Sequence, residues 1–174
     1  LNGAALAALA AGVGSDCALF LSPGPSVMRG RGERIEPLAK EAYSRFRGTR
    51  VLLFKPGFPI PTPWAYGRLA AEAPRAYMPA ARAEAMLASW IAKAGAPVEE
   101  VFFNSMERPA FAKFPAIPAL LEEIRSRFGI TARLSGSGSA CFAFLHENMD
   151  AGAVEGVIRA DWGPSAFVME TRVA

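Results

Sequence analysis

The sequence has few of the residues that build metal centres, disulfide frameworks and nucleophilic triads. Its 174 residues include two cysteines, Cys17 and Cys141, and one histidine, His146. A structural zinc site needs three or four such ligands, and the cysteines form no C-x-x-C pair. We therefore expect no metal site within the chain, and we expect both cysteines to be reduced core residues of a cytoplasmic protein. No serine stands beside His146, so a Ser-His-Asp triad is not expected.

Charge of one sign and long apolar runs are also scarce. Nineteen Lys and Arg against sixteen Asp and Glu leave a net charge of +3, and Glu33 interrupts the densest basic stretch, residues 29–34. Without clustered charge or interleaved aromatic residues we expect no nucleic-acid partner. Asp16, glycines and prolines break the apolar stretches, so we expect no membrane-spanning segment and no membrane partner.

Several short catalytic motifs are missing as well. The sequence contains no G-x-x-x-x-G-K-[ST], G-x-G-x-x-G, H-E-x-x-H or G-x-S-x-G. It begins with Leu1 instead of Met, within a pattern typical of a helix. We therefore expect a fragment of a longer protein, although 52% apolar residues over this length are enough for a folded domain.

Turn residues and apolar periodicity predict the secondary structure. Before residue 50 we expect a helix that ends at Gly12 and Gly14, a short segment over 17–21, and strands over 26–30 and 34–38. After it we expect strands over 51–54, 131–134, 140–145 and 166–171, and helices over 62–73, 80–94, 117–128 and 150–160. This order predicts an α+β fold, in which helices cover one face of an antiparallel sheet of ferredoxin-like type.

Three local features could carry chemistry, and each has two interpretations. Asp16 follows Gly14 and Ser15, so it is either an ordinary helix cap or a carboxylate that accepts a proton from a hydroxyl. The S-G-S-G-S segment, residues 135–139, is either a plain hairpin turn or a loop whose N–H groups bind an anion.

The third feature is the start of the helix over 62–73. Thr62 is expected to be its N-cap, with Pro63 at the first helical position. Tyr66, one turn on, would either stack on a planar ligand or pack into the core.

Five segments, taken in order, resemble the GHMP kinases and, among them, the kinases of 4-diphosphocytidyl-2-C-methyl-D-erythritol. Residues 14–20 and 30–33 are similar to the G-A/S-D-V-P-F-F … G-x-G-E stretch of that family. Residues 55–63, K-P-G-F-P-I-P-T-P, are similar to its P-G-x-x-I-P-T-P/A segment. The other three similarities are N-S-M-E at 104–107 to N-D-L-E, F-P-A-I at 114–117 to Y-P-E-I, and residues 134–142 to the glycine motif near the end of GHMP kinases.

The resemblance implies a fold and a reaction. Residues 48–174 would form the GHMP kinase C-terminal domain, and residues 1–47 would be the tail of the N-terminal domain. The enzyme would use ATP and Mg²⁺ to phosphorylate the 2-hydroxyl of 4-diphosphocytidyl-2-C-methyl-D-erythritol, a step of non-mevalonate isoprenoid biosynthesis. Phosphoryl transfer depends mainly on positioning and on stabilising charge.

The resemblance also implies roles for single residues. Asp16 would be the catalytic carboxylate. Thr62, Pro63 and Tyr66 would line the binding site of the small-molecule substrate, and Gly136, Ser137 and Gly138 would help to shape that site.

Some features of the family are absent or altered. Its ATP loop, substrate lysine and cytosine-binding histidine precede the matching region, so we expect the partner of this chain to be a missing N-terminal half and the isolated chain to be inactive. We then expect exposed apolar surface along residues 1–38. Cys17-Ala18-Leu19 replaces Val-Pro-Phe, and Ser105-Met106 replaces Asp-Leu. Two alternatives remain open: another GHMP kinase, for homoserine, mevalonate or a sugar, and a non-catalytic binding module.

Overall fold

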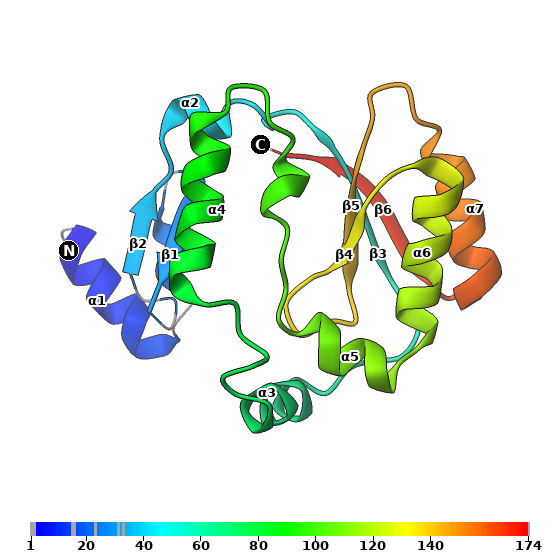
Figure 1. The fold of residues 1–174 in the computed structure, drawn as a ribbon, viewed down its shortest axis with the longest axis horizontal. Coiled ribbons are helices and arrows are strands. Elements are labelled where there is room, and N and C mark those ends of the chain that lie inside the picture. Colours follow the sequence, from blue (N-terminus) through cyan, green and yellow to red (C-terminus); the bar gives the residue numbers. More distant parts are fainter. Residues whose placement is uncertain (1–2, 15–16, 23, 31, 33, 174) are drawn as a thin grey trace. The chain divides into compact units, whose positions relative to one another are not determined.

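The computed structural model describes residues 3–14, 17–22, 24–30, 32 and 34–173. Contacts within the chain divide it into two compact units, Leu1–Arg45 and Phe46–Ala174. Figure 1 gives the order of the helices and strands along the chain.

The first unit is small and has several apolar side chains in solvent. It contains a helix, α1 (Gly3–Val13), a 3₁₀ turn, η1 (Cys17–Leu21), a hairpin of β1 (Ser26–Arg29) and β2 (Arg34–Pro37), and a one-turn helix, α2 (Lys40–Tyr43). Exposed large apolar side chains on α1 and η1 include Leu9, Val13 and Phe20. Exposed apolar surface was expected along residues 1–38; among the described residues it is found on α1 and η1, whereas Val27, Met28 and Ile35 of the hairpin are partly buried.

The second unit is built on an antiparallel sheet with the strand order β4-β5-β3-β6. Its strands are β3 (Arg50–Lys55), β4 (Ala132–Leu134), β5 (Cys141–Leu145) and β6 (Phe167–Arg172). The apolar run that predicted a strand over 51–54 lies in β3, which pairs with a neighbour on each side. The predicted α+β class and antiparallel sheet are confirmed.

Helices connect the strands of this unit. Between β3 and β4 the chain forms α3 (Thr62–Ala71), α4 (Ala80–Ala92), η2 (Val98–Val101), α5 (Glu107–Lys113) and α6 (Ala116–Phe128). After β5 it forms α7 (Ala151–Trp162), which Figure 1 shows beside α6. The last strand, β6, returns to pair with β3.

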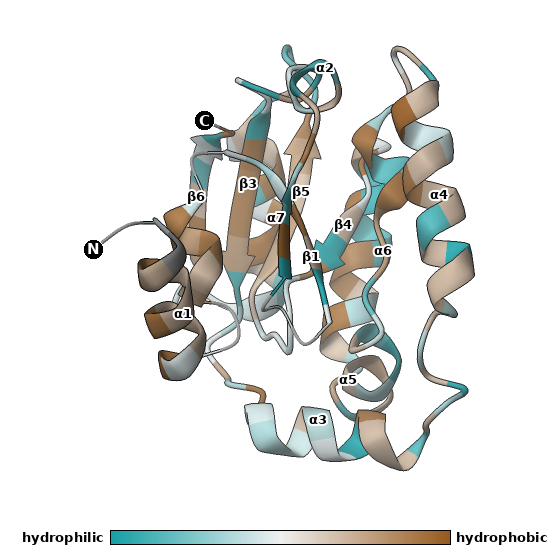
Figure 2. Cartoon of the chain, turned by 90° about the vertical axis from the view of Figure 1, so that its left-hand side faces the viewer, coloured by the Kyte–Doolittle hydropathy of each residue, from teal (hydrophilic) through white to brown (hydrophobic). Residues whose placement is uncertain are grey.

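The core lies between the sheet and the helices α6 and α7. Leu52 and Phe54 point to this side of β3 and are each 1% exposed. They belong to one buried cluster with the apolar faces of both helices, whose members include Ile117, Leu120 and Ile124 of α6 and Val154 and Ile158 of α7. Figure 2 shows the hydrophobic colouring of the central strands. The predicted periodicity over 117–128 is therefore the buried face of α6, which ends at Gly129 in a left-handed cap.

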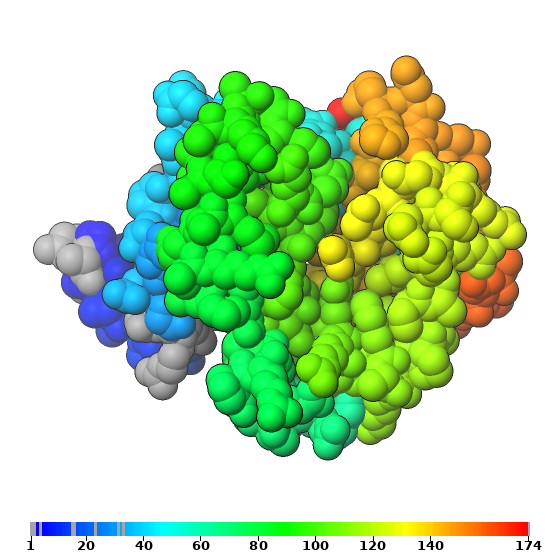
Figure 3. Space-filling view, viewed as in Figure 1, coloured from blue at the N-terminus to red at the C-terminus, as the bar shows by residue number. Residues whose placement is uncertain are grey.

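Aromatic side chains cover part of the other face of the sheet. Leu53 of β3 lies opposite Phe142 in the register, and Val51 lies opposite Phe144. Phe102, just after η2, packs against the rings of Phe142 and Phe144 at 5.3 and 5.4 Å. Helix α4 is mostly exposed except for Trp90 and the partly buried Met86 and Leu87, and Figure 3 shows it as a prominent green surface.

Two short α-helices, α5 and α2, and the 3₁₀ helix η2 lie where no element was predicted. Helix α5 contains Pro109, which a sequence pattern treats as a helix breaker. Pro109 is the third residue of the helix, where its missing N–H would have had no partner within the helix. Helix α2 lies in the polar stretch before β3. The remaining differences are at ends: α3 stops at Ala71 and α4 at Ala92, whereas α7 extends to Trp162.

Arg50 ties three segments together at the start of β3. Its guanidinium pairs with Glu170 of β6 through two hydrogen bonds of 2.6 and 3.0 Å. It also donates to the carbonyl oxygens of His146, Glu147 and Met149, in the connection between β5 and α7. The hydrogen bonds and positive charge of Arg50 lower the pKa of the Glu170 carboxyl below its ordinary value of 4.5.

We expect the Arg50–Glu170 pair to make stability depend on pH in the acidic range. A carboxyl whose pKa is lower in the folded state contributes stability above its unfolded pKa and loses it as the pH falls through the folded pKa. The difference in free energy of unfolding between the native chain and Glu170→Gln should therefore be full at neutral pH and shrink below about pH 4.5. Denaturant titrations from pH 3 to 7 measure it. A difference that stays constant or grows in acid would contradict this interpretation.

Candidate functional site

The S-G-S-G-S segment forms a tight turn between β4 and β5, and we call residues 135–139 the glycine loop. The N–H of Ser135 donates to the carbonyl of Ala140 at 2.8 Å, and the N–H of Gly138 donates to the carbonyl of Ser135 at 2.9 Å. Gly136 and Gly138 have positive φ angles of 53° and 79°. L-residues with a side chain rarely adopt such angles, so the loop needs glycine at both positions.

Gly138 also has no room for a side chain. A Cβ there would lie 2.8 Å from Leu134 Cδ1 and 2.9 Å from Ile60 Cδ1. Both neighbours are buried, with exposed fractions of 1% and 4%. Gly136, in contrast, has no atom within 4 Å of its would-be Cβ. One end of the glycine loop is therefore packed against the segment that precedes α3, and the other end is open.

Thr62 contacts the glycine loop, and it is not the N-cap of α3. Its hydroxyl lies 3.0 Å from the hydroxyl of Ser137, 75 residues further along the chain. The N-cap is Pro61, whose extended backbone (φ −64°, ψ 116°) leads into the helix and whose side chain makes no capping hydrogen bond. The cap expected at Thr62 was wrong, because Thr62 already lies within the helix, and Pro63 consequently takes its second position.

A buried serine also holds the packed end of the glycine loop, next to Gly138. Ser139 is 2% exposed, and its hydroxyl donates to the carbonyl of Phe58 at 2.6 Å. The Phe58 ring stacks on Phe114 at 5.6 Å, and the Trp64 ring of α3 meets Phe114 edge-on at 5.7 Å. These contacts join three of the segments that carry the family resemblance, namely residues 55–63, 114–117 and 134–142.

Asn104 and Glu107, in the N-S-M-E segment, bind the strand that enters the glycine loop. The Asn104 amide donates to the carbonyls of Leu134 and Gly136 at 2.8 and 2.9 Å. The Glu107 carboxylate accepts the Leu134 N–H at 3.1 Å and pairs with Arg133 at 3.0 Å. The sequence showed these residues only as part of a motif and assigned them no role.

Pro63, Tyr66 and Asp16 complete the set of residues expected at the site. Pro63 is exposed, and Tyr66 is 59% exposed on α3, one turn after Thr62. Packing of Tyr66 into the core is therefore wrong, and its stacking on a ligand stays a proposal. Asp16 lies outside the described residues. The glycine loop, Thr62, Pro63 and Tyr66 all belong to the second unit.

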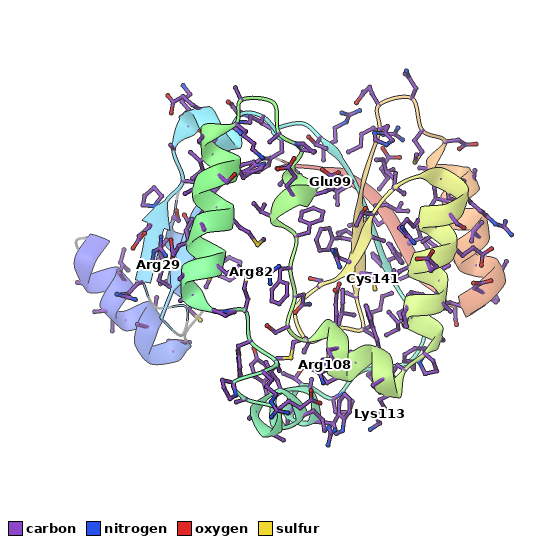
Figure 4. The ribbon with its side chains drawn as sticks, viewed as in Figure 1. Arg29, Arg82, Glu99, Arg108, Lys113 and Cys141 are labelled. Atoms are coloured by element: carbon purple, nitrogen blue, oxygen red, sulfur yellow. The ribbon has the colours of Figure 1, made fainter. Side chains whose placement is uncertain are left out.

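A separate cavity of about 460 Å³ lies beside the segment that carries Asn104. Figure 4 shows Arg82 extending from α4 toward that segment. The cavity is lined mainly by exposed or partly exposed residues, including Arg75, Tyr77, Arg82 and Phe103, and by no residue of the glycine loop. No sequence pattern pointed to this cavity.

Within the part of the chain that the structure describes, no group of three or more His, Cys, Asp and Glu side chains could hold a metal ion. None of the helices in these residues is both long enough and apolar enough to cross a membrane.

Cys141 is the first residue of β5, two residues after the glycine loop, and Figure 4 labels it. It is 1% exposed. Burial, together with the nearby negative charge of Glu107, raises the pKa of its thiol to about 12. Only the thiolate is nucleophilic, so the thiol is inert at physiological pH. Cys17, in the first unit, is partly exposed, so its expected place in a core was wrong.

We expect thiol reagents to distinguish the two cysteines. At pH 8 in the folded chain, iodoacetamide should alkylate the partly exposed Cys17. It should not alkylate Cys141, because the Cys141 thiol is both buried and protonated. In denaturant both should react. Mass spectrometry after timed labelling counts the modified sites, and Cys17→Ser isolates the behaviour of Cys141. Labelling of Cys141 in folded Cys17→Ser at the rate of a free thiol would contradict the prediction.

The class of protein follows from this domain. Residues 82–164, from α4 to just beyond α7, match the family described as GHMP kinases C terminal. This part of the chain is a GHMP kinase C-terminal domain, and the predicted family and fold are confirmed. The match includes the glycine loop and the N-S-M-E segment.

Three relatives with similar sequences share one name, that of a kinase for a single substrate. The chain is similar to proteins named 4-diphosphocytidyl-2-C-methyl-D-erythritol kinase from Methylacidiphilum infernorum (36% identity over 138 residues, 79% of this chain and 42% of the relative) and Gloeobacter violaceus (30% over 171 residues, 97% and 55%). A third such relative, from Thermus thermophilus, is 35% identical over 162 residues, which cover 91% of this chain and 52% of the relative.

A solved structure gives the same result. The crystal structure of a 4-(cytidine 5'-diphospho)-2C-methyl-D-erythritol kinase superposes with a TM-score of 0.68 at 32% identity, and the match covers 97% of this chain and 57% of that one. The chain thus spans about half the length of the curated relatives it matches.

Proposed function

We propose that this chain is part of a kinase that transfers the γ-phosphoryl group of ATP to the 2-hydroxyl of 4-diphosphocytidyl-2-C-methyl-D-erythritol. The observation that carries the proposal is the 3.0 Å contact between Thr62 and Ser137. It joins the two segments that the family resemblance assigns to the substrate site, at the surface of one folded unit. The relatives' names supply the particular substrate.

The residues take the following roles in this proposal. Tyr66 stacks on the planar base of the substrate from its exposed position on α3, and Thr62 and Pro63 line the same side. Gly136, Ser137 and Gly138 shape the opposite side. Asp16 orients the attacking hydroxyl and accepts its proton. We further propose that the enzyme acts in the cytoplasm.

ATP and Mg²⁺ belong to the proposal through the family. ATP would supply the phosphoryl group, and Mg²⁺ would neutralise charge on its phosphates. In a protein of the relatives' length, the segment that holds them would lie outside these 174 residues, residues 1–47 would end the N-terminal domain, and residues 48–174 would form the C-terminal one. The 174-residue chain alone is then expected to show no turnover.

An activity assay tests the proposal. The full-length protein that contains this chain should release ADP with 4-diphosphocytidyl-2-C-methyl-D-erythritol, and ³¹P NMR should show a new phosphate monoester. Homoserine, mevalonate and galactose serve as alternative acceptors and should give at least 100-fold lower kcat/KM. Faster turnover of any of these, or no turnover of any acceptor, would contradict the proposal.

A further inference from the structure

The backbone carbonyls and N–H groups around the start of the glycine loop have different partners. The carbonyls of Leu134 and Gly136 both accept hydrogen bonds from the Asn104 amide, at 2.8 and 2.9 Å. The side-chain oxygen of Asn104, Oδ1, accepts the N–H of Met106 at 2.9 Å. Asn104 therefore uses both donors and its acceptor, and its orientation is set from both sides.

The N–H groups at the open end of the glycine loop are unused. The N–H groups of Ser135 and Gly138 donate within the turn. Those of Gly136 and Ser137 make no hydrogen bond to any residue that the structure describes. Gly136 is exposed, Ser137 is partly exposed, and the Ser137 hydroxyl meets that of Thr62 beside them.

We propose that Asn104 is a positioning residue for a diphosphate group bound at the glycine loop. By holding the carbonyls of Leu134 and Gly136, it keeps two negative dipole ends away from the ligand and leaves the N–H groups of Gly136 and Ser137 to donate to phosphate oxygens. Successive N–H groups in a turn with a left-handed residue form a concave binding place for anions. The proposal rests on the proposed function only for the molecule to which the diphosphate belongs.

The chemistry of the side chain explains why asparagine suits this position. A primary amide carries two N–H donors and one acceptor on a single plane. An aspartate at 104 would place carboxylate oxygens against two carbonyl oxygens and repel them. Glu107 supports the same arrangement, because it accepts the N–H of Leu134 and so fixes the peptide that precedes the glycine loop.

Amide NMR of the ¹⁵N-labelled 174-residue chain tests the proposal. Addition of inorganic pyrophosphate should shift the amide signals of Gly136 and Ser137, and Asn104→Ala should weaken this binding at least tenfold while the rest of the spectrum stays dispersed. Ser105→Ala is the matched control, because the partly buried Ser105 side chain makes no hydrogen bond to the described residues. It should bind as the native chain does.

A second variant covers the case in which Asn104→Ala does not fold. Asn104→Ser keeps one donor, so its affinity should lie between those of the native chain and a full loss. Native-like affinity in either folded Asn104 variant, or no shift of these two amides in the native chain, would overturn the proposal. Binding without kinase activity in the full-length protein would instead contradict the proposed function alone. Parallel titrations with CDP and ADP show which molecule supplies the diphosphate.

Discussion

Replacement of Gly138 by alanine is expected to destabilise the second unit by about 2–5 kcal/mol. The added Cβ would lie 2.8 Å from Leu134 Cδ1 and 2.9 Å from Ile60 Cδ1. Overpacking of this kind costs about 1–3 kcal/mol, and a left-handed backbone costs about 1–2 kcal/mol more in a residue with a side chain. For a chain of this size we expect the melting temperature to fall by roughly 4–20 °C, which calorimetry or circular dichroism measures.

Gly136→Ala is the matched control for this substitution. Gly136 has a positive φ angle of 53°, and its would-be Cβ meets nothing within 4 Å. Only the backbone cost of about 1–2 kcal/mol applies there. Equal losses of stability in the two variants would show that Gly138 is not packed as described.

Replacement of Asp16 by asparagine in the full-length kinase is expected to lower kcat by about 10²–10⁴-fold, the usual contribution of a general base. The side-chain amide of asparagine cannot accept the proton of the attacking hydroxyl. Asparagine is nearly the same size as aspartate, so the substitution removes the base without changing the packing. The thermal stability should remain unchanged. The prediction depends on the proposed function and on the resemblance of the Gly14-Ser15-Asp16 segment to the family's catalytic motif.

Asp150→Asn provides the corresponding control. Asp150 is the N-cap of α7, and its carboxylate accepts the N–H of Gly152 at 2.9 Å. Asparagine caps helices about as well as aspartate, so both turnover and stability should be retained. If Asp16→Asn is as active as this control, Asp16 has no catalytic role.

Much of the fold was predictable because it depends on residues close together in the sequence. The apolar run over 51–54 predicted β3, and the repeat of Ile117, Leu120 and Ile124 predicted the buried face of α6. The S-G-S-G-S segment predicted a turn, which Gly136 and Gly138 form with positive φ angles. In each case a local pattern and a local requirement coincide.

The errors arose where tertiary contacts or position within a helix decided the outcome. Thr62 has the residue type of a helix cap, but its hydroxyl pairs with Ser137 and Pro61 takes the N-cap position. No helix was predicted over 107–113, yet Pro109 lies in the first turn of α5, where it removes no hydrogen bond of the helix. The exposure of Tyr66 also depended on the packing of α3 and could not be read from its spacing.

By itself the sequence determined the family, the α+β class and the need for glycine in the loop, because motifs, periodicity and backbone sterics act over a few residues. Only the tertiary structure decided which polar groups meet. Thr62 and Ser137 are 75 residues apart, and Asn104 reaches a carbonyl 30 residues away. Such pairs form because the sheet and its helices bring distant segments together, and no local pattern encodes that distance.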